Sequence, residues 1–578
     1  MPDLHPGIFL IAAGMITSFL PKKLRQICTI LCPALAFLIT VTTPIGTVIK
    51  YSFLQFTDLV AMQVTKENYM FLFIFSLTGL VAGIYSAHND SRLDPFAAMG
   101  YTGSALGVTL AGDWITMILF WEFMAVTSLL LIWDNRTTRS TKAGFRYLVM
   151  HMFGGNCLLF GIVWKVFHGS ILIENINQAP DLGFWFILLG VLVNAGAFPF
   201  HAWVPDAYPE ATLSGTIYLG SFTTKVAVLC LLRIFAGNKI LLIAGIVMIF
   251  YGALFAMMEN DMRRLLSYHI ISQVGYMVAD AGLGGEIGIN AGTALAYSNI
   301  IYKSLLFMCA GAIIYATGIR KINQLGGLAK KMPFVCICFF IAALSITGVP
   351  PLAGFTCKSL SILAAEELGG ELVVLLMMTG SIATALSIPF KMGYFIFFGK
   401  DRNLSVGKIP ANMKIAMGIS AGLCIFTGIF PQLTYRLLPY ALDYHPYTLH
   451  HILEYVQLVG AALIAFLLFL KIMEPHSMIT LDTDWFVRKP MKRMLFGLSK
   501  AVCAVQSFCA GGGRKLYHTL QITSSNPYRV LRQKPYNKAD QKDHLHYQED
   551  AYRLKIGAGM ACVLIAILLV AAYIILKH

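Results

Sequence analysis

The stretch FVCICFFIAALSITGVPPLAGFTCKSL, residues 334–360, decides the class of this protein. It begins with an apolar run of membrane-spanning character, which ends at Gly348-Val349-Pro350-Pro351, and Lys358 follows shortly afterwards. Proline interrupts a helix, and irregular backbone at membrane depth is tolerated only inside protein or beside water. The stretch therefore predicts a membrane protein that contains a broken helix and a buried charge.

The composition of the whole chain is also that of a membrane protein. Of its 578 residues 57% are hydrophobic and 13% are charged, whereas soluble domains carry roughly a quarter charged residues. A soluble enzyme is excluded, and one large polytopic membrane domain is expected. The formal charge of +15 fits basic loops on one side of a membrane, and because no nucleic-acid-binding motif accompanies it, we expect no nucleic-acid partner.

Apolar runs of about 17 to 25 residues are typical of transmembrane helices. The chain has sixteen, predicted near residues 6–20, 25–44, 68–87, 95–112, 114–133, 144–167, 184–200, 211–235, 239–258, 265–284, 290–317, 334–355, 371–398, 411–430, 451–472 and 557–576. The first reads as a span and not as a cleaved signal peptide, since its basic residues follow the apolar run.

The distribution of basic residues predicts the orientation. Lys and Arg follow spans one, five, nine, eleven and thirteen, whereas the loops after spans four, six and ten have none. By the positive-inside rule the N-terminus should lie outside the cell and odd-numbered loops in the cytoplasm of a bacterial or archaeal inner membrane.

Residues 473–556 differ in composition, with 14 Lys+Arg against 7 Asp+Glu. They should lie in the cytoplasm. Residues 491–511 combine an apolar stripe with basic residues, which is typical of a helix lying along the membrane interface; a surface-bound linker is the alternative. Gly511-Gly512-Gly513, Pro527 and Pro535 are expected to break any single long helix.

Ionisable residues inside spans are expensive and point to function. Four stand out: Glu122, Lys225, Lys303 and Lys358. A buried ion pair that only locks two helices together is the structural alternative. A row of titratable groups at membrane depth is, however, what a proton relay needs, because a buried lysine can change its protonation when a neighbouring charge moves.

Three histidines add candidates. His269 lies inside span ten and His201 ends span seven, and a hydrogen-bonded core histidine is the alternative for either; for His151, in span six, both interpretations stay open. The twelve cysteines are scattered without metal or cluster spacing, so no metal and no cofactor is expected.

Span seven runs into AFPFHAWVPDAYPEA and span twelve into TGVPPLAGFTCK, so two spans five apart end in interrupted backbone. Paired interruptions indicate an inverted-repeat transporter. The expected segments are N-terminal helices (1–94), a first inverted repeat (95–235), a second inverted repeat (239–398), C-terminal helices (411–472), the basic segment (473–556) and a final helix (557–578).

Four motifs carry a family resemblance: HAWVPDAYPEAT (201–212), RRLLSYHIISQVGYM (263–277), IIYKSLLFMCAGA (300–312) and GVPPLAGFTCK (348–358). In these the chain resembles the antiporter-like subunits of respiratory complex I, of Mrp cation/proton antiporters (their D-type subunit above all) and of energy-converting hydrogenases. The resemblance covers spans one to fourteen and implies an all-α fold of about 14 core helices, with two inverted five-helix repeats around a midmembrane line of charges and water.

Matched by motif, the resemblance gives Glu122, Lys225, Lys303 and Lys358 the family's charged positions on helices five, eight, eleven and twelve. Glu122 would pair with a lysine, and Lys358 would pass the proton onward. Two positions depart from the family.

Asn194 replaces the usual lysine on broken helix seven, and Asn299 replaces a histidine four residues before Lys303. Asparagine cannot hold a proton near neutral pH. The first half-channel is therefore expected either to run through Lys225 and His201 or not to conduct.

The resulting hypothesis is a membrane subunit that moves protons through Glu122, Lys225, His269, Lys303 and Lys358, with or without exchange for sodium. We expect it to act in a multi-subunit complex with other membrane subunits, further antiporter-like or redox subunits among them, and not to be catalytic alone. The alternatives are a non-conducting scaffold, a quinone or redox enzyme, and a component of another ion-uptake system.

Overall fold

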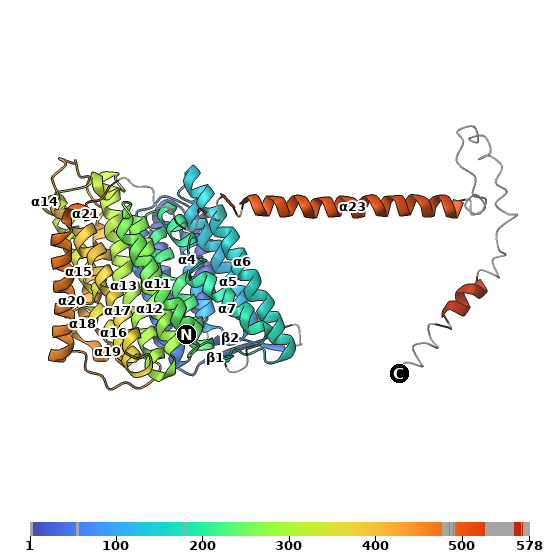
Figure 1. Cartoon of the computed structure of the whole chain (residues 1–578), viewed down its shortest axis with the longest axis horizontal. Coiled ribbons are helices and arrows are strands. Elements are labelled where there is room, and N and C mark those ends of the chain that lie inside the picture. The colour runs from blue at the N-terminus through green and yellow to red at the C-terminus, as the bar shows by residue number, and fades with distance from the viewer. Residues whose placement is uncertain are drawn as a thin grey trace. The chain divides into compact units, whose positions relative to one another are not determined.

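The computed structural model describes residues 4–53, 57–177, 180–476, 482, 485, 489–490, 492–525, 560–567 and 569. The chain divides into two units, Met1–Asp484 and Trp485–His578, and each is described by itself. The first unit is a bundle of helices whose axes are roughly aligned with one another (Figure 1). The predicted final span, 557–576, lies largely outside the described residues.

Fifteen of the predicted spans coincide with helices of the bundle, which confirms an all-α polytopic membrane protein. The unbroken ones are α1 (Pro6–Phe19), α2 (Lys22–Thr42), α3 (Lys66–Ser86), α4 (Leu93–Leu110), α5 (Trp114–Trp133), α6 (Thr138–His168), α11 (Lys239–Met258), α12 (Met262–Leu283), α13 (Gly285–Thr317), α18 (Ala411–Ile429) and α20 (Leu449–Leu468). By length and composition, eleven helices among the described residues could cross a membrane, one of them outside the bundle.

Four spans are interrupted or irregular. The seventh ends as α7 (Leu182–Ala195) before the short α8 (Trp203–Ala207), and the twelfth divides into α15 (Pro333–Thr347) and α16 (Ala353–Leu368). Both breaks begin at a glycine in the left-handed region, Gly196 and Gly348.

The eighth span, expected as one helix, divides at Phe222 into α9 (Gly215–Ser221) and α10 (Thr223–Ile234). The thirteenth continues from α17 (Glu371–Ala385) into a π-helix, η3 (Leu386–Phe398), which contains Pro389. Proline cannot donate the regular helical hydrogen bond, so a widened turn at this place has a local cause.

A small hairpin that sequence analysis did not anticipate covers one end of the bundle. Strands β1 (Val48–Phe53) and β2 (Thr57–Gln63) pair antiparallel. Asp113, the N-cap of α5, accepts hydrogen bonds from the backbone N–H of Thr116 (2.7 Å) and of Val60 on β2 (2.7 Å). One carboxylate thus starts a helix and holds the hairpin.

The interior of the bundle lies around α12 and α13, most of whose residues are buried, whereas α2, α11 and α20 expose one apolar side. An apolar exposed side is stable only against lipid or another apolar surface. This distribution places the polar side chains of α12 and α13 at the centre of the protein.

The second unit contains α23 (Lys492–Ser525), which passes without interruption through Gly511-Gly512-Gly513. The expectation that these glycines break the helix is wrong: each glycine costs roughly 1 kcal/mol of helix propensity, which a helix of 34 residues tolerates. Pro527 and Pro535 lie outside the described residues. The helix carries five Lys+Arg and no acidic residue.

Candidate functional site

Lys225 lies in the first turn of α10, immediately after the break in the eighth span. Its side chain is fully buried, and Nζ donates to the carbonyl oxygen of Gly220 on α9 at 2.8 Å. A break leaves carbonyls without their helical partners. The lysine therefore bridges the two half-helices.

Lys303 lies in the middle of α13 and is likewise buried. Its Nζ has no hydrogen-bond partner among the described residues, and Lys225 is close enough to act on it electrostatically. Burying a charged or polar group without a partner is costly, and ordered water normally satisfies such groups. The position thus calls for water inside the bundle.

His269 on α12 continues the row. Its Nε2 is 2.7 Å from Ser387 Oγ on η3, and Nδ1 has no partner among the described residues. Three lysines act on it electrostatically: Lys303, Lys358 and Lys391. His269 therefore lies between the charge at the centre of α13 and the charges of the twelfth and thirteenth spans.

Lys358 lies in the second turn of α16, just beyond the break. Nζ is 3.4 Å from Ser381 Oγ on α17 and 5.4 Å from the centre of the Tyr276 ring. A cation above an aromatic face gains electrostatic stabilisation without an ion pair. No salt bridge joins Lys225, Lys303 or Lys358 to any described carboxylate.

Asn299 precedes Lys303 by one helical turn. Its Nδ2 donates to the Tyr302 hydroxyl at 3.2 Å, and that hydroxyl donates to Gln273 Oε1 on α12 at 3.2 Å. Asn299 Oδ1 and Gln273 Nε2 have no partner among the described residues. The replacement of histidine by Asn299 thus leaves a polar cluster beside Lys303 that can hold water.

Glu122 is not part of this row. It is half-buried on α5, where its carboxylate lies against Gly155 of α6, so that a Cβ atom on that glycine would collide with Oε1. Asn194, in the place where the family resemblance implied a lysine partner, donates instead to the Gly190 carbonyl at 3.2 Å. No ion pair joins Glu122 to a described residue.

His201 lies apart from the lysines, in the segment between α7 and α8. It is fully buried, and Nε2 is 3.3 Å from Asp482 Oδ1. The hydroxyls of Tyr251 on α11 and Tyr268 on α12 also donate to this carboxylate. Asp482 could not be predicted from the sequence, because nothing in a polar loop marks one carboxylate as the partner of a histidine 281 residues earlier.

Asp482 lies outside the spans, and its environment explains its charge. Burial alone would raise the pKa of the carboxyl, but hydrogen bonds from His201, Tyr251 and Tyr268 hold that pKa well below its usual range. Asp482 is therefore a carboxylate at neutral pH, and it fixes the chain after α20 against the segment that contains His201.

Two further buried ionisable side chains were not singled out from the sequence. Lys391 on η3 donates to the carbonyl of Met257, in the last turn of α11, and to that of Glu259 (2.9 Å), just beyond the helix. Asp280 on α12 accepts from Ser361 Oγ at 2.6 Å, and its Oδ1 has no partner among the described residues. Both lie in predicted spans, so the rule that identified Lys303 would have found them.

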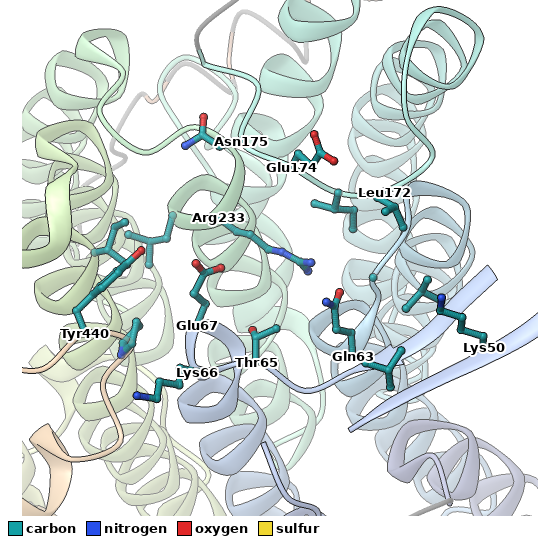
Figure 2. A pocket seen from close by; sticks show the side chains of 17 residues that line it. Lys50, Gln63, Thr65, Lys66, Glu67, Leu172, Glu174, Asn175, Arg233 and Tyr440 are labelled. Carbon is teal, nitrogen blue, oxygen red and sulfur yellow. The ribbon is translucent and has the colours of Figure 1, made fainter. Parts of the chain in front are cut away.

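A cavity of about 810 Å³ opens at the end of the bundle near the hairpin. Arg233, two turns after Lys225 on α10, lines it together with Lys50, Lys66, Glu67 and Glu174. Figure 2 shows Arg233 and Glu67 in the same hollow, with Lys50 on β1 and Tyr440 on opposite sides. Glu67 acts electrostatically on Arg233, so the helix of Lys225 ends at a cavity lined by charged side chains.

Within the described part of the chain, no three His, Cys, Asp or Glu side chains are grouped as a metal site would require. The fold and the row of buried lysines with a histidine define a multi-pass membrane protein of the antiporter-like class.

The chain belongs to the family of antiporter-like membrane subunits: residues 111–387 match the family described as NADH:quinone oxidoreductase/Mrp antiporter, TM. It is 30% identical over 346 residues to the D-type subunit of a Na(+)/H(+) antiporter from Alkalihalophilus pseudofirmus, covering 55% of this chain and 69% of the relative. It is 26% identical over 382 residues to an uncharacterised protein of Methanocaldococcus jannaschii, covering 62% and 79%.

Solved structures share the fold. A chain in the structure of the Mrp complex from Dietzia sp. DQ12-45-1b superposes with a TM-score of 0.69 at 21% identity, covering 78% of this chain and 98% of that one. A chain of respiratory complex I from Thermus thermophilus gives 0.65 at 21%, covering 76% and 100%. The structural relatives are subunits of multi-subunit membrane complexes.

Proposed function

We propose that this chain translocates protons across the membrane as one subunit of a larger complex. The observation that carries the proposal is the row Lys225–Lys303–His269–Lys358, in which each group lies within electrostatic range of the next and none has a carboxylate partner in the described structure. Isolated ion pairs that lock helices would show paired charges, so the structural alternative has less support.

The row can act as a relay because like charges repel. A proton on Lys303 raises the energy of a proton on Lys225 or on His269, so an arriving proton favours release at the next group. Polar atoms without described partners along α12 and α13 call for water, which would carry the proton between side chains. Movement of charge in a neighbouring subunit would drive the sequence.

The name of one relative identifies sodium as the ion to test for exchange with protons. The Alkalihalophilus relative is named as part of a Na⁺/H⁺ antiporter, and exchange of protons for sodium is the form of the activity that we propose to test. The expected partners are other membrane subunits of the same complex, in a bacterial or archaeal inner membrane with the N-terminus outside and residues 473–556 in the cytoplasm.

A second candidate function is a non-conducting scaffold. Glu122 without an ion-pair partner and Asn194 in place of the implied lysine favour it, because they remove the expected charge pair from the first repeat. Both candidates predict an assembled complex, and only ion flux separates them.

The test is proton flux into proteoliposomes of the purified native complex, with and without sodium. We expect Lys303→Ala and Lys225→Ala each to abolish flux at matched assembly, because each removes one station of the row. Lys239→Ala, at the exposed first residue of α11, is the matched control and should leave flux unchanged.

Wild-type flux in both variants, with the complex intact, would overturn the relay and favour the scaffold. Dependence of the flux on a sodium gradient would identify exchange.

A further inference from the structure

His151 on α6 is a buried histidine that the row of lysines does not include. Only 4% of its surface is exposed. Its ring packs on Tyr147, one turn earlier, with centroids 4.0 Å apart, and against Trp203 of α8 at 4.8 Å. The ring therefore lies at the place where α6 meets the break in the seventh span.

Two polar atoms at this place lack partners. By distance and angle, neither His151 Nε2 nor Asn194 Oδ1 forms a regular hydrogen bond with a described residue, and the two side chains lie close enough to interact with each other. Leaving two such groups unsatisfied would cost several kcal/mol, and an apolar side chain at either position would avoid it. A polar site that fits water between them is the physical resolution.

Hydroxyl groups lead from this site toward Lys225. The Tyr147 hydroxyl is 2.7 Å from Ser128 Oγ on α5 and within reach of Thr223. Thr223 Oγ1 in turn is 2.6 Å from the Tyr101 hydroxyl on α4. Thr223 begins α10 and precedes Lys225 by two residues, so the polar path ends at the break that Lys225 bridges.

Hydroxyls can pass a proton but do not hold one near neutral pH, because the pKa of tyrosine is about 10. Within this cluster His151 is the side chain whose ordinary pKa lies nearest to neutrality. Glu122, on the other side of Gly155, contacts none of these hydroxyls through a described hydrogen bond.

We propose that His151, with water held at Asn194, is the proton-carrying residue of the first repeat and exchanges its proton with Lys225 through the Tyr147–Thr223 hydroxyls. The proposal rests on the proposed function and deepens it. A proton bound at His151 Nε2 leaves to water; each hydroxyl accepts one proton and releases its own, and the Lys225 amine takes up the last. Every hydroxyl is regenerated, and the net change is one proton moved from imidazolium to amine.

The test uses the native complex in proteoliposomes and the variants His151→Gln, Tyr147→Phe and His151→Gln combined with Asn194→Lys. Glutamine keeps the polar contact but cannot hold a proton, so we expect His151→Gln to lower proton flux ~100-fold, in the range of a lost acid–base group. Tyr147→Phe keeps the ring packing and should also lower flux. The lysine at position 194 returns a titratable group to the same water site and should restore flux.

Thermal unfolding and subunit content provide the measure of folding, and Lys303→Ala is the reference for the proposed function. Wild-type flux in His151→Gln, while Lys303→Ala has none, would overturn this inference and leave the proposed function standing. Failure of Asn194→Lys to restore flux in an assembled complex would assign His151 a structural role and would also overturn it. If neither His151→Gln nor Lys303→Ala lowers flux, the proposed function itself is wrong.

Discussion

At the scale of single residues, the buried ionisable side chains differ in how completely the protein satisfies their polar atoms. Lys303 and His269 each have a polar nitrogen that no described residue satisfies, whereas Lys391 donates to two backbone carbonyls. A satisfied buried charge holds structure in place, and an unsatisfied one needs water. Lys391 is therefore expected to act as a structural support for the end of α11.

The hydrogen bonds to Asp482 lead to a prediction about local stability and its dependence on pH. Because hydrogen bonds from His201, Tyr251 and Tyr268 depress its pKa, its contribution to stability is present above the unfolded pKa of about 4 and is lost as pH falls through the lower folded value. The Asp482 carboxylate should therefore contribute no change in local stability between pH 7 and pH 5. Asp482→Asn should weaken it by ~2 kcal/mol, the worth of a hydrogen bond to a charged group.

Hydrogen–deuterium exchange of the segment around Asp482, corrected for intrinsic rates, measures this effect. The substitution should accelerate exchange about 30-fold. The exposed Asp443→Asn is the matched control and should change nothing. Equal exchange in Asp482→Asn and wild type would contradict the contact.

At the scale of elements, the interruptions of the helices determine where buried lysine side chains lie. The seventh and twelfth spans each end at a left-handed glycine, and the eighth breaks just before Lys225. A break exposes carbonyls inside the bundle, and at the break in the eighth span the Gly220 carbonyl accepts a hydrogen bond from Lys225. The two interruptions five spans apart agree with the predicted inverted repeats, which remain a prediction.

Substitutions at Gly196 test the left-handed end of α7, where the seventh span is interrupted. Its φ of +71° is unfavourable for residues with a side chain, and a Cβ atom would lie 3.2 Å from Val204 Cγ2. We expect Gly196→Ala to destabilise the protein by about 1–2 kcal/mol and Gly196→Asn by less, since asparagine tolerates this conformation. Gly422→Ala, in α18 with open space around it, is the control and should be neutral or stabilising.

Thermal unfolding of the purified complex ranks the three variants by their stability. If Gly196→Ala matched wild type while Gly422→Ala behaved as expected, the left-handed end of α7 would be wrong.

At the scale of the whole molecule, orientation decides which side supplies protons. The alternation of basic loops predicts that residues 473–556 face the cytoplasm and that the loop after the second span faces outward. Cys503 and Cys509 on α23 are exposed and provide natural labels.

A membrane-impermeant maleimide should label Cys503 and Cys509 in inverted membrane vesicles but not in intact cells, in a Cys562→Ala background. Ile45→Cys, in the exposed loop after α2, should show the opposite pattern. Mass spectrometry of the labelled peptides reads out both. Labelling of Cys503 in intact cells would reverse the predicted orientation.

The sequence by itself determined the spans, the breaks and the charges inside spans, because hydrophobic length, proline and a lysine in an apolar run are local properties. It therefore identified Lys225, Lys303, Lys358 and His269. It did not find the hairpin, the division at Phe222 or the continuous α23, where local propensities are weak or where helix length outweighs three glycines.

Only the tertiary structure decided which charges act on one another. It brought Lys225, Lys303, His269 and Lys358 into one row, left Glu122 outside it, paired His201 with Asp482 and placed His151 beside Asn194. These contacts join residues tens to hundreds of positions apart, and they depend on which side of each helix faces the interior. Packing of whole helices sets that, and no local pattern in the chain encodes it.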